Sequence, residues 1–400
     1  MDFWDNKDWR FVRLQLCALG VWPFQKPILR KVIGFFIVLS VQTITAPEII
    51  KFTFVWRDLQ QFADCFPLIG IHLTCTLKWM CCVVNMNKII ALLNMIKSDN
   101  LSTELAEKEH KILDDTARLN RLFVVFYSVW IYMVAISFLI FVPLIPPTMD
   151  LFSPLNESRP KMSIYRTEYL FDSKKYGWVI ILHQCIISPF PTMIIIATGS
   201  LYSNLCQHAC GMFKVIGHRL RNLGVPSDAG TDEKKLDNRT RNEIFRTSLI
   251  TCDQMHKRML GYVDKFQDIY SNTLCFSMTM SIITLCICGL QCIIKKDEFY
   301  EVLRFGTCTL AIIADVFILC WYGQKLIDSS DYLYFCACQC NWYLCSTTQQ
   351  KLLISMIVKL STPCSVTLGK LYRVSLECFG TIMKTTMSYF TVINSMRDEE

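Results

Sequence analysis

Two uncharged stretches of this chain are each long enough to cross a lipid bilayer. They run from Leu122 to Met149 and from Ile269 to Ile294. A helix that crosses the roughly 30 Å of hydrocarbon in a bilayer needs about 20 mostly apolar residues. A core helix of that length in a soluble protein would still present a polar face, and neither stretch has one. The sequence therefore predicts a helical membrane protein.

Five further segments are predicted to span the membrane, although most of them contain a charged residue or a proline. These segments are 32–50, 66–90, 177–205, 305–324 and 374–396, and Lys78 interrupts the second of these. The last is the least hydrophobic, and hydropathy alone would miss it. Only 19% of the chain is charged, compared with about 25% in soluble domains. The predicted fold class is all-α, a polytopic membrane protein with seven transmembrane helices.

The distribution of Lys and Arg gives these spans a direction. If the N-terminus is cytoplasmic, the inner segments hold 28 of these residues and the outer segments hold 10. Basic residues in short loops favour the cytoplasmic side, so we expect the N-terminus inside and the C-terminus outside. This orientation is opposite to that of a G-protein-coupled receptor.

The segments on the cytoplasmic side are themselves expected to be helical. Residues 99–121 are rich in helix formers and should continue the second span or lead into the third. Residues 199–223 and 241–267 carry apolar positions at helical spacing, which predicts extensions of the fourth and fifth spans. A further helix is expected within 328–362, followed by a turn at 361–365. Together these helices predict an intracellular bundle.

The chemistry of the chain gives no reason to expect an enzyme, a bound metal or a cofactor. Most of the 21 cysteines lie in apolar segments, where a free cysteine behaves as a small hydrophobe. The six histidines match no zinc or catalytic spacing. The net charge of +7 is concentrated on the predicted cytoplasmic segments, which favours anionic membrane lipid as a partner over nucleic acid.

Five motifs, in order along the chain, resemble those of the insect odorant receptors. They are Leu14–Pro23 (LQLCALGVWP), His208–Leu220 (HACGMFKVIGHRL), Phe317–Ile327 (FILCWYGQKLI), Trp342–Leu353 and Tyr389–Met396 (YFTVINSM). The resemblance covers almost the whole chain. It is to the ligand-tuned, divergent type of receptor and not to the co-receptor, which is longer and has a larger inner loop before the fifth span.

This resemblance implies a ligand-gated, non-selective cation channel in the plasma membrane of an olfactory neuron dendrite. It also implies a heterotetramer with the co-receptor, in which four copies of the last helix line the pore and small volatile odorants bind in the outer half of each subunit. The chain would then divide into three parts. They are a six-helix ligand-binding region (1–324), a cytoplasmic anchor helix (325–365) and a pore-lining seventh helix with an outer tail (366–400).

One face of the last predicted helix is small and hydroxylated apart from a valine. Its members recur at spacings of four and three residues, which places them on one side of a helix; they are Thr381, Thr385, Ser388, Val392 and Ser395. Such a face can line a water-filled pore. By the resemblance, Val392 falls at the hydrophobic gate and Ser395 falls near the outer mouth, where the co-receptor has glutamine. The alternative is that small residues let neighbouring helices pack closely.

A ligand pocket for small, mostly apolar odorants is expected to be apolar and aromatic with few polar groups. Thirteen residues in the outer halves of the spans are the candidates. They are Ile71, His72, Cys75, Tyr127, Trp130, Ile131, Val134, Ile181, His183, Phe276, Met280, Thr309 and Ile312. Asp315 lies midway along the sixth span, where an unpaired charge is costly. Its candidate partners are serines and threonines of neighbouring spans, and its role is either structural hydrogen bonding or gating.

Two other classes of protein stay open as alternatives. A transporter would bind its substrate near the middle of the membrane on broken helices, and it often has repeated halves. No repeat is evident, although Pro189 and Pro191 could break the fourth span. A metabotropic chemoreceptor linked to a G protein is opposed by the predicted orientation.

Overall fold

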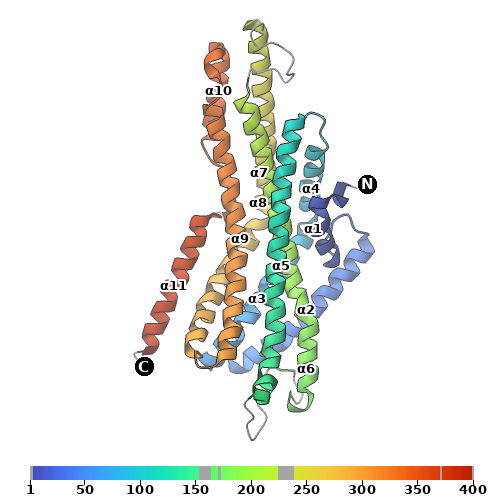
Figure 1. The fold of residues 1–400 in the computed structure, drawn as a ribbon, viewed down its shortest axis with the longest axis vertical. Coiled ribbons are helices and arrows are strands. Elements are labelled where there is room, and N and C mark those ends of the chain that lie inside the picture. The colour runs from blue at the N-terminus through green and yellow to red at the C-terminus, as the bar shows by residue number, and fades with distance from the viewer. Residues whose placement is uncertain (1–2, 153–163, 170–172, 224–237, 370–371, 399–400) are drawn as a thin grey trace.

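The computed structural model describes residues 3–152, 164–169, 173–223, 238–369 and 372–398, and these residues are almost entirely helical (Figure 1). The long helices are α2 (Pro27–Val55), α3 (Leu59–Val84), α5 (Glu107–Phe152), α6 (Ser173–Ile187), α7 (Pro189–Arg221), α8 (Asn238–Ile294), α9 (Phe299–Cys338) and α11 (Leu376–Asp398). Shorter helices are η1 (Phe3–Asp5), α1 (Lys7–Ala18), α4 (Met86–Asn100), η3 (Trp342–Leu344) and α10 (Thr347–Leu360). The described sheet is a single antiparallel pair, β1 (Thr367–Leu368) with β2 (Tyr372–Arg373).

Six helical stretches in the described residues are long and apolar enough to cross a membrane. They are α2, α3, Glu107–Ile140 of α5, α6 together with α7, α8 and α9. The seventh, α11, has 23 residues and so reaches about 35 Å, although it is not apolar enough to be found in the same way. Large apolar side chains on the outside of the bundle, such as Phe35 and Phe126 at 70% exposure each, face the lipid. The predicted all-α membrane fold is confirmed.

The inner ends of α7, α8 and α9 project beyond the other helices and pack together with α10, at the top of Figure 1. Most residues of α7 from Ile194 to Leu220 are buried, so this helix forms the axis of the bundle. Basic residues end α7, and Glu107 and Glu109 begin α5, as the helix dipole favours. Lys359 of α10 pairs with Asp253 of α8 at 3.0 Å. The expected intracellular extensions of the fourth and fifth spans are therefore present.

Three boundaries differ from those expected. The second span ends at Val84, because Asn85 separates α3 from α4 and its side chain donates to the carbonyl of Cys81 at 3.1 Å. The fourth span is interrupted at Ser188, where Pro189 lacks the amide that would continue the helix. The domain boundary drawn after Gln324 falls inside α9, which continues to Cys338.

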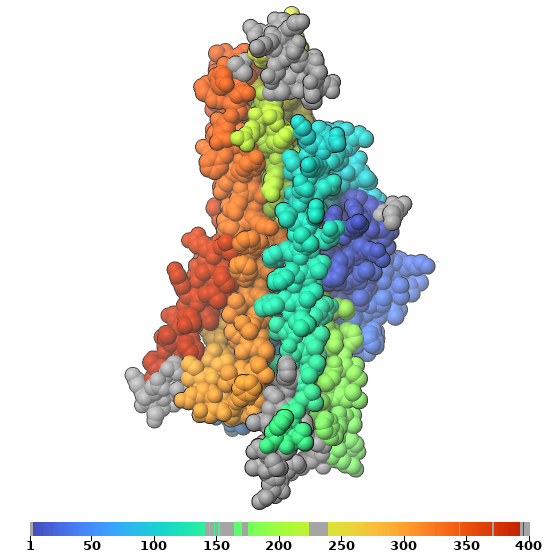
Figure 2. Space-filling model, in the orientation of Figure 1, coloured from blue at the N-terminus to red at the C-terminus, as the bar shows by residue number. Residues whose placement is uncertain are grey.

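The segment that leads into α11 is attached to both α8 and α9. The side chain of Gln267 on α8 exchanges hydrogen bonds with the backbone of Thr367, at 2.7 and 2.8 Å. On α9, the side-chain oxygen of Gln324 accepts from the amide of Leu376 at 3.3 Å. From this junction α11 runs along one side of the bundle at an angle to it (Figures 1 and 2).

Candidate functional site

A cavity of about 140 Å³ lies among α3, α5, α7, α8 and α9. With a cytoplasmic N-terminus it occupies the outer half of the bundle. A cavity of about 150 Å³ can hold benzene, so this one is suited to a molecule of about six to eight non-hydrogen atoms. Its wall is mainly apolar, and its polar groups come from a few side chains, among them His72, Lys78, Ser188, Thr284 and Asp315.

Six of the thirteen predicted pocket residues line this cavity. They are Ile71, His72, Ile131, Val134, Met280 and Ile312. They come from four different helices that are far apart in the sequence, so the fold brings them together. Their contact with a ligand stays a prediction.

The other seven are not in the cavity wall, and four of them are engaged elsewhere by hydrogen bonds. The thiol of Cys75 donates to the carbonyl of Pro191 at 3.6 Å, and the Thr309 hydroxyl donates to the carbonyl of Phe305 at 2.8 Å. The Tyr127 hydroxyl is 3.4 Å from Asp315. The ring of His183 lies 3.2 Å from the Thr43 hydroxyl and 2.9 Å from the Tyr169 hydroxyl.

The remaining three predicted residues face other directions. Trp130 is 36% exposed and Phe276 is 40% exposed, both on the outer surface of the bundle, while Ile181 is buried away from the cavity. The rotation of each helix turns these side chains away from the cavity. The geometry therefore does not support a ligand contact for these seven residues.

A buried ion pair forms part of the cavity wall. The ammonium of Lys78 on α3 lies 2.7 Å from a carboxylate oxygen of Asp315 on α9. The two side chains are 8% and 16% exposed, respectively. The expectation that Asp315 pairs with serines or threonines is thus wrong, because its carboxylate contacts the ammonium of Lys78 and the hydroxyl of Tyr127.

A second buried pair lies in the same wall. Nδ1 of His72 is 2.7 Å from a carboxylate oxygen of Glu48 on α2, and both side chains are 2% exposed. The ring of Tyr165 lies against the His72 ring, with 5.3 Å between centroids. The Tyr165 hydroxyl donates to Ser188 at 2.8 Å, beside the break between α6 and α7.

Tyr165 belongs to a segment of the outer loop, 164–169, which inserts into the bundle and covers part of the cavity. The side-chain oxygen of Gln184 accepts from the amides of Ile164 and Tyr165, at 3.0 and 3.2 Å. The amide of Glu168 donates to the carbonyl of Pro47 at 3.0 Å. The sequence analysis did not predict that this segment enters the bundle. The signal for it in the sequence is an apolar and an aromatic residue, Ile164 and Tyr165, inside a polar loop.

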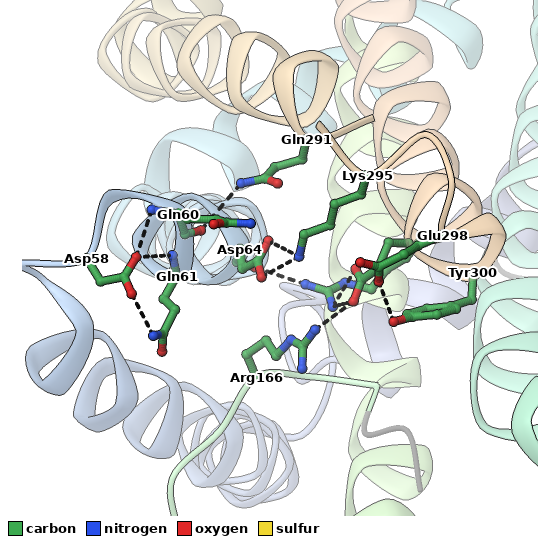
Figure 3. Close-up of polar contacts among 11 residues, drawn as sticks. Asp58, Gln60, Gln61, Asp64, Arg166, Gln291, Lys295, Glu298 and Tyr300 are labelled. Atoms are coloured by element: carbon green, nitrogen blue, oxygen red, sulfur yellow. Dashed lines mark hydrogen bonds and ion pairs between the residues drawn. The ribbon is translucent and has the colours of Figure 1, made fainter. Parts of the chain in front are cut away.

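A cluster of charged residues holds the outer ends of the helices and this segment together (Figure 3). Lys295 of α8 lies 2.6 Å from Asp64 of α3, and Arg304 of α9 donates to the carbonyl of Asp64 at 2.9 Å. Arg304 also pairs with Glu301 at 3.1 Å. Arg166 of the loop segment reaches the fully buried Glu301 at 2.6 Å, so the cluster ties the loop to α9.

The helix start beside this cluster is stabilised by its own cap. Asp58 precedes α3 and accepts from the backbone amides of Gln61 and Gln60, at 3.1 and 3.0 Å. The hydrogen bonds from the backbone and the side chain of Gln61 hold the pKa of the Asp58 carboxyl below its ordinary value. A charged N-cap of this kind fixes where α3 begins.

The predicted pore face of α11 is turned away from the subunit. Thr381, Ser388, Val392 and Ser395 are exposed, and Thr385 is partly buried. The opposite side packs on the bundle, where Ile382 is 5% exposed. The rings of Phe379 and of Phe317 on α9 lie against each other, with 5.5 Å between their centroids. The thiol of Cys286 on α8 donates to the carbonyl of Thr386 at 3.7 Å. One helix therefore presents an apolar face inward and a hydroxylated face outward. A role in a pore stays a prediction.

Comparison with known proteins gives one family. A sequence profile of the 7tm odorant receptor family matches residues 35–387. Odorant receptor Or1 of Anopheles gambiae is 25% identical over 279 residues, which are 66% of this chain and 67% of that protein. Odorant receptor Or2 of the same species is 20% identical over 380 residues, which are 93% and 95% of the two chains.

The fold matches a solved structure over nearly its full length. The insect olfactory receptor OR5 from Machilis hrabei, in complex with eugenol, superposes with a TM-score of 0.79. The match covers 97% of both chains at 14% identity, so it is a likeness of fold. Because the family profile matches most of the length of this chain, the chain belongs to the 7tm odorant receptor family of insects.

Proposed function

We propose that this chain is the odorant-binding subunit of a ligand-gated, non-selective cation channel in the plasma membrane. Small volatile odorants would bind in the cavity in the outer half of the bundle, and α11 would line the pore with Val392 as its gate. The observation that carries the proposal is that a single subunit has both features. It has a cavity of about 140 Å³ and a helix whose hydroxylated face is exposed at four of its five positions.

An exposed hydroxylated face on a membrane helix supports assembly with further subunits. The Thr381 and Ser395 hydroxyls donate to carbonyls of their own helix, at 3.0 and 2.9 Å. Their remaining acceptor positions are satisfied better by water or another subunit than by lipid. A ring of four subunits that includes the co-receptor would place α11 around a central pore. Residues 1–324 would bind the ligand, 325–365 would anchor the subunit in the cytoplasmic layer, and 366–400 would conduct ions. The residues from 325 to 338 are then the inner end of α9.

Currents in cells that express the chain with the co-receptor test the channel. Odorant-evoked currents should persist when G proteins are blocked. Loss of the response under this block would favour a metabotropic receptor. Currents that require a co-transported substrate and reverse with its gradient would favour a transporter.

A cavity-filling variant tests the ligand site. Ala311 lines the cavity, and Ala311→Leu adds three carbons, which occupy about 75 Å³ if benzene needs about 150 Å³. This is roughly half of the cavity. Displacing three ligand carbons at about 0.8 kcal/mol each should raise the half-maximal odorant concentration roughly 50-fold.

Leu310→Phe is the matched control, because it also adds three carbons but at a side chain that is 54% exposed on the outer surface. It should leave the odorant response unchanged. An Ala311→Leu receptor that reaches the cell surface and responds to every active odorant at the wild-type concentration would exclude this cavity as the ligand site.

A further inference from the structure

We infer that the ammonium group of Lys78 is the polar anchor of the cavity, and that it selects neutral ligands with a hydrogen-bond-accepting oxygen. The inference rests on the proposed function, in which this cavity holds the ligand. It assigns a chemical class to that ligand and a role to a residue that the sequence analysis treated only as an interruption of a membrane span.

The geometry leaves the ammonium with donors to spare. A lysine ammonium carries three N–H donors. Among the described residues, Asp315 accepts one of them, at 2.7 Å. Asp315 in turn accepts from Tyr127 at 3.4 Å, so both of its oxygens are engaged while two donors of Lys78 are not. Lys78 and Asp315 both line the cavity.

A second, smaller cavity adjoins Lys78 on its inner side. It has a volume of about 20 Å³, enough for a single water molecule. Tyr202, Tyr270 and Ser277 line it, and their hydroxyls have no hydrogen-bond partner among the described residues. This inner cavity can satisfy one donor of Lys78, which leaves one donor for the larger cavity.

A purely structural contact at this depth would not need charge. Replacing a buried ion pair by apolar residues of similar volume is often neutral or stabilising, and ionisable residues within membrane spans mark functional sites by default. A donor that has already lost its water also forms a stronger hydrogen bond with a ligand, because the local dielectric constant is low.

The charge of the pair limits the ligand class. Lys78 and Asp315 together are neutral, so a neutral acceptor adds a hydrogen bond without adding charge. A carboxylate would compete with Asp315 for the ammonium of Lys78, and this ammonium would repel a protonated amine. The size of the cavity restricts the ligand further, to about six to eight non-hydrogen atoms. Small ketones and aldehydes fit both conditions.

Ligands of equal size with and without the oxygen test the inference. Cyclohexanone is compared with methylcyclohexane, and benzaldehyde with styrene, by thermal stabilisation of the purified full chain in detergent. A hydrogen bond to a charged group should make the wild type prefer the oxygenated member about ten- to hundredfold. The preference should fall below about threefold in the variant Lys78→Met with Asp315→Leu, which removes both charges together.

Two further variants complete the test. Ile312→Val trims an apolar cavity residue, so it should weaken both members of a pair equally and keep the preference. Lys78→Gln with Asp315→Asn keeps the hydrogen-bonding groups without charge, so it should lower the preference without abolishing it. This second pair decides the matter if the Met and Leu variant does not fold.

Three outcomes would overturn the inference. One is equal binding of the two members by the wild type, and another is a preference that survives removal of the pair. In both cases the proposed function would still stand if odorants evoke currents and Ala311→Leu weakens those currents. The third is binding of neither member together with no current from any odorant, and this result would also reject the proposed function.

Discussion

Gly323 provides a sharp test of how the last helix is attached to the bundle. A Cβ atom at this position would lie 2.3 Å from the carbonyl oxygen of Val374, just before α11. Ordinary contact begins at 3.4 Å, so the carbonyl would have to move by roughly 1 Å. Val374 is fully buried, and its amide donates to the carbonyl of Val366 at 2.8 Å. A shift of this strand would therefore strain or break that hydrogen bond.

The expected free-energy change follows from three terms. Alanine is favoured over glycine inside a helix by about 0.8–1.0 kcal/mol. Overpacking typically costs about 1–3 kcal/mol, and a lost hydrogen bond costs about 1 kcal/mol. Gly323→Ala should therefore destabilise the protein by about 1–3 kcal/mol. Gly306 lies on the same helix and has no atom within 4 Å of an added Cβ, so Gly306→Ala should instead be stabilising, by up to about 1 kcal/mol.

The two variants are compared by thermal unfolding of the purified protein in detergent and by odorant-evoked current. Gly323→Ala should lower the melting temperature and reduce the current at equal surface expression. Gly306→Ala should raise the melting temperature or leave it unchanged. A Gly323→Ala protein that melts no lower than the wild type and conducts normally would refute the close approach of α9 and the α11 junction.

Three other predictions concern buried charge and the pore. Lys78→Met alone should destabilise the protein by about 3–5 kcal/mol, because it leaves Asp315 buried without its partner, and adding Asp315→Leu should restore the melting temperature. Glu301→Gln should be similarly destabilising, since it removes the partner of the buried Arg304. Arg166→Gln should change stability by no more than about 1 kcal/mol, because the Arg166 side chain is 43% exposed; equal melting temperatures for these two variants would contradict the assignment. Val392→Ser should increase the current without odorant, because a hydrophobic constriction closes by dewetting, and an unchanged basal current would argue against a gate there.

The membrane spans were predictable because length and apolar content are local properties of the sequence. The rotation of each helix about its axis was not. Trp130 and Val134 are one turn apart and were expected to face the same pocket, yet Val134 lines the cavity and Trp130 is 36% exposed. Residues four apart differ by about 40° around a helix, which is enough to separate a cavity wall from a lipid-facing surface.

Family membership confirms the expectation that the chain is not an enzyme.

Pairings between distant residues were also beyond the sequence. Lys78 and Asp315 are 237 positions apart, and each was considered as a single charge within its own span. Tyr165 lies in an outer loop whose composition predicts no contact with the bundle, yet it is 5% exposed and packs on His72. In both cases the tertiary fold creates the contact, and the local sequence does not identify the partner.

Two of the helices in the cavity wall, α8 and α9, also hold the start of the last helix. On α9, Asp315 is in the cavity wall, and Gly323 and Gln324 contact the α11 junction eight and nine positions later, or about 12–14 Å along the axis. On α8, Thr284 lines the cavity and Gln267 binds Thr367 of β1. Both helices are continuous between these points, so under the proposed function a ligand that moves either helix in the cavity wall would also move the junction. The motif FILCWYGQKLI, which carried part of the family resemblance, contains both contacts from α9. A physical reason for that motif is thus the close docking that only a glycine, followed by an amide side chain, allows.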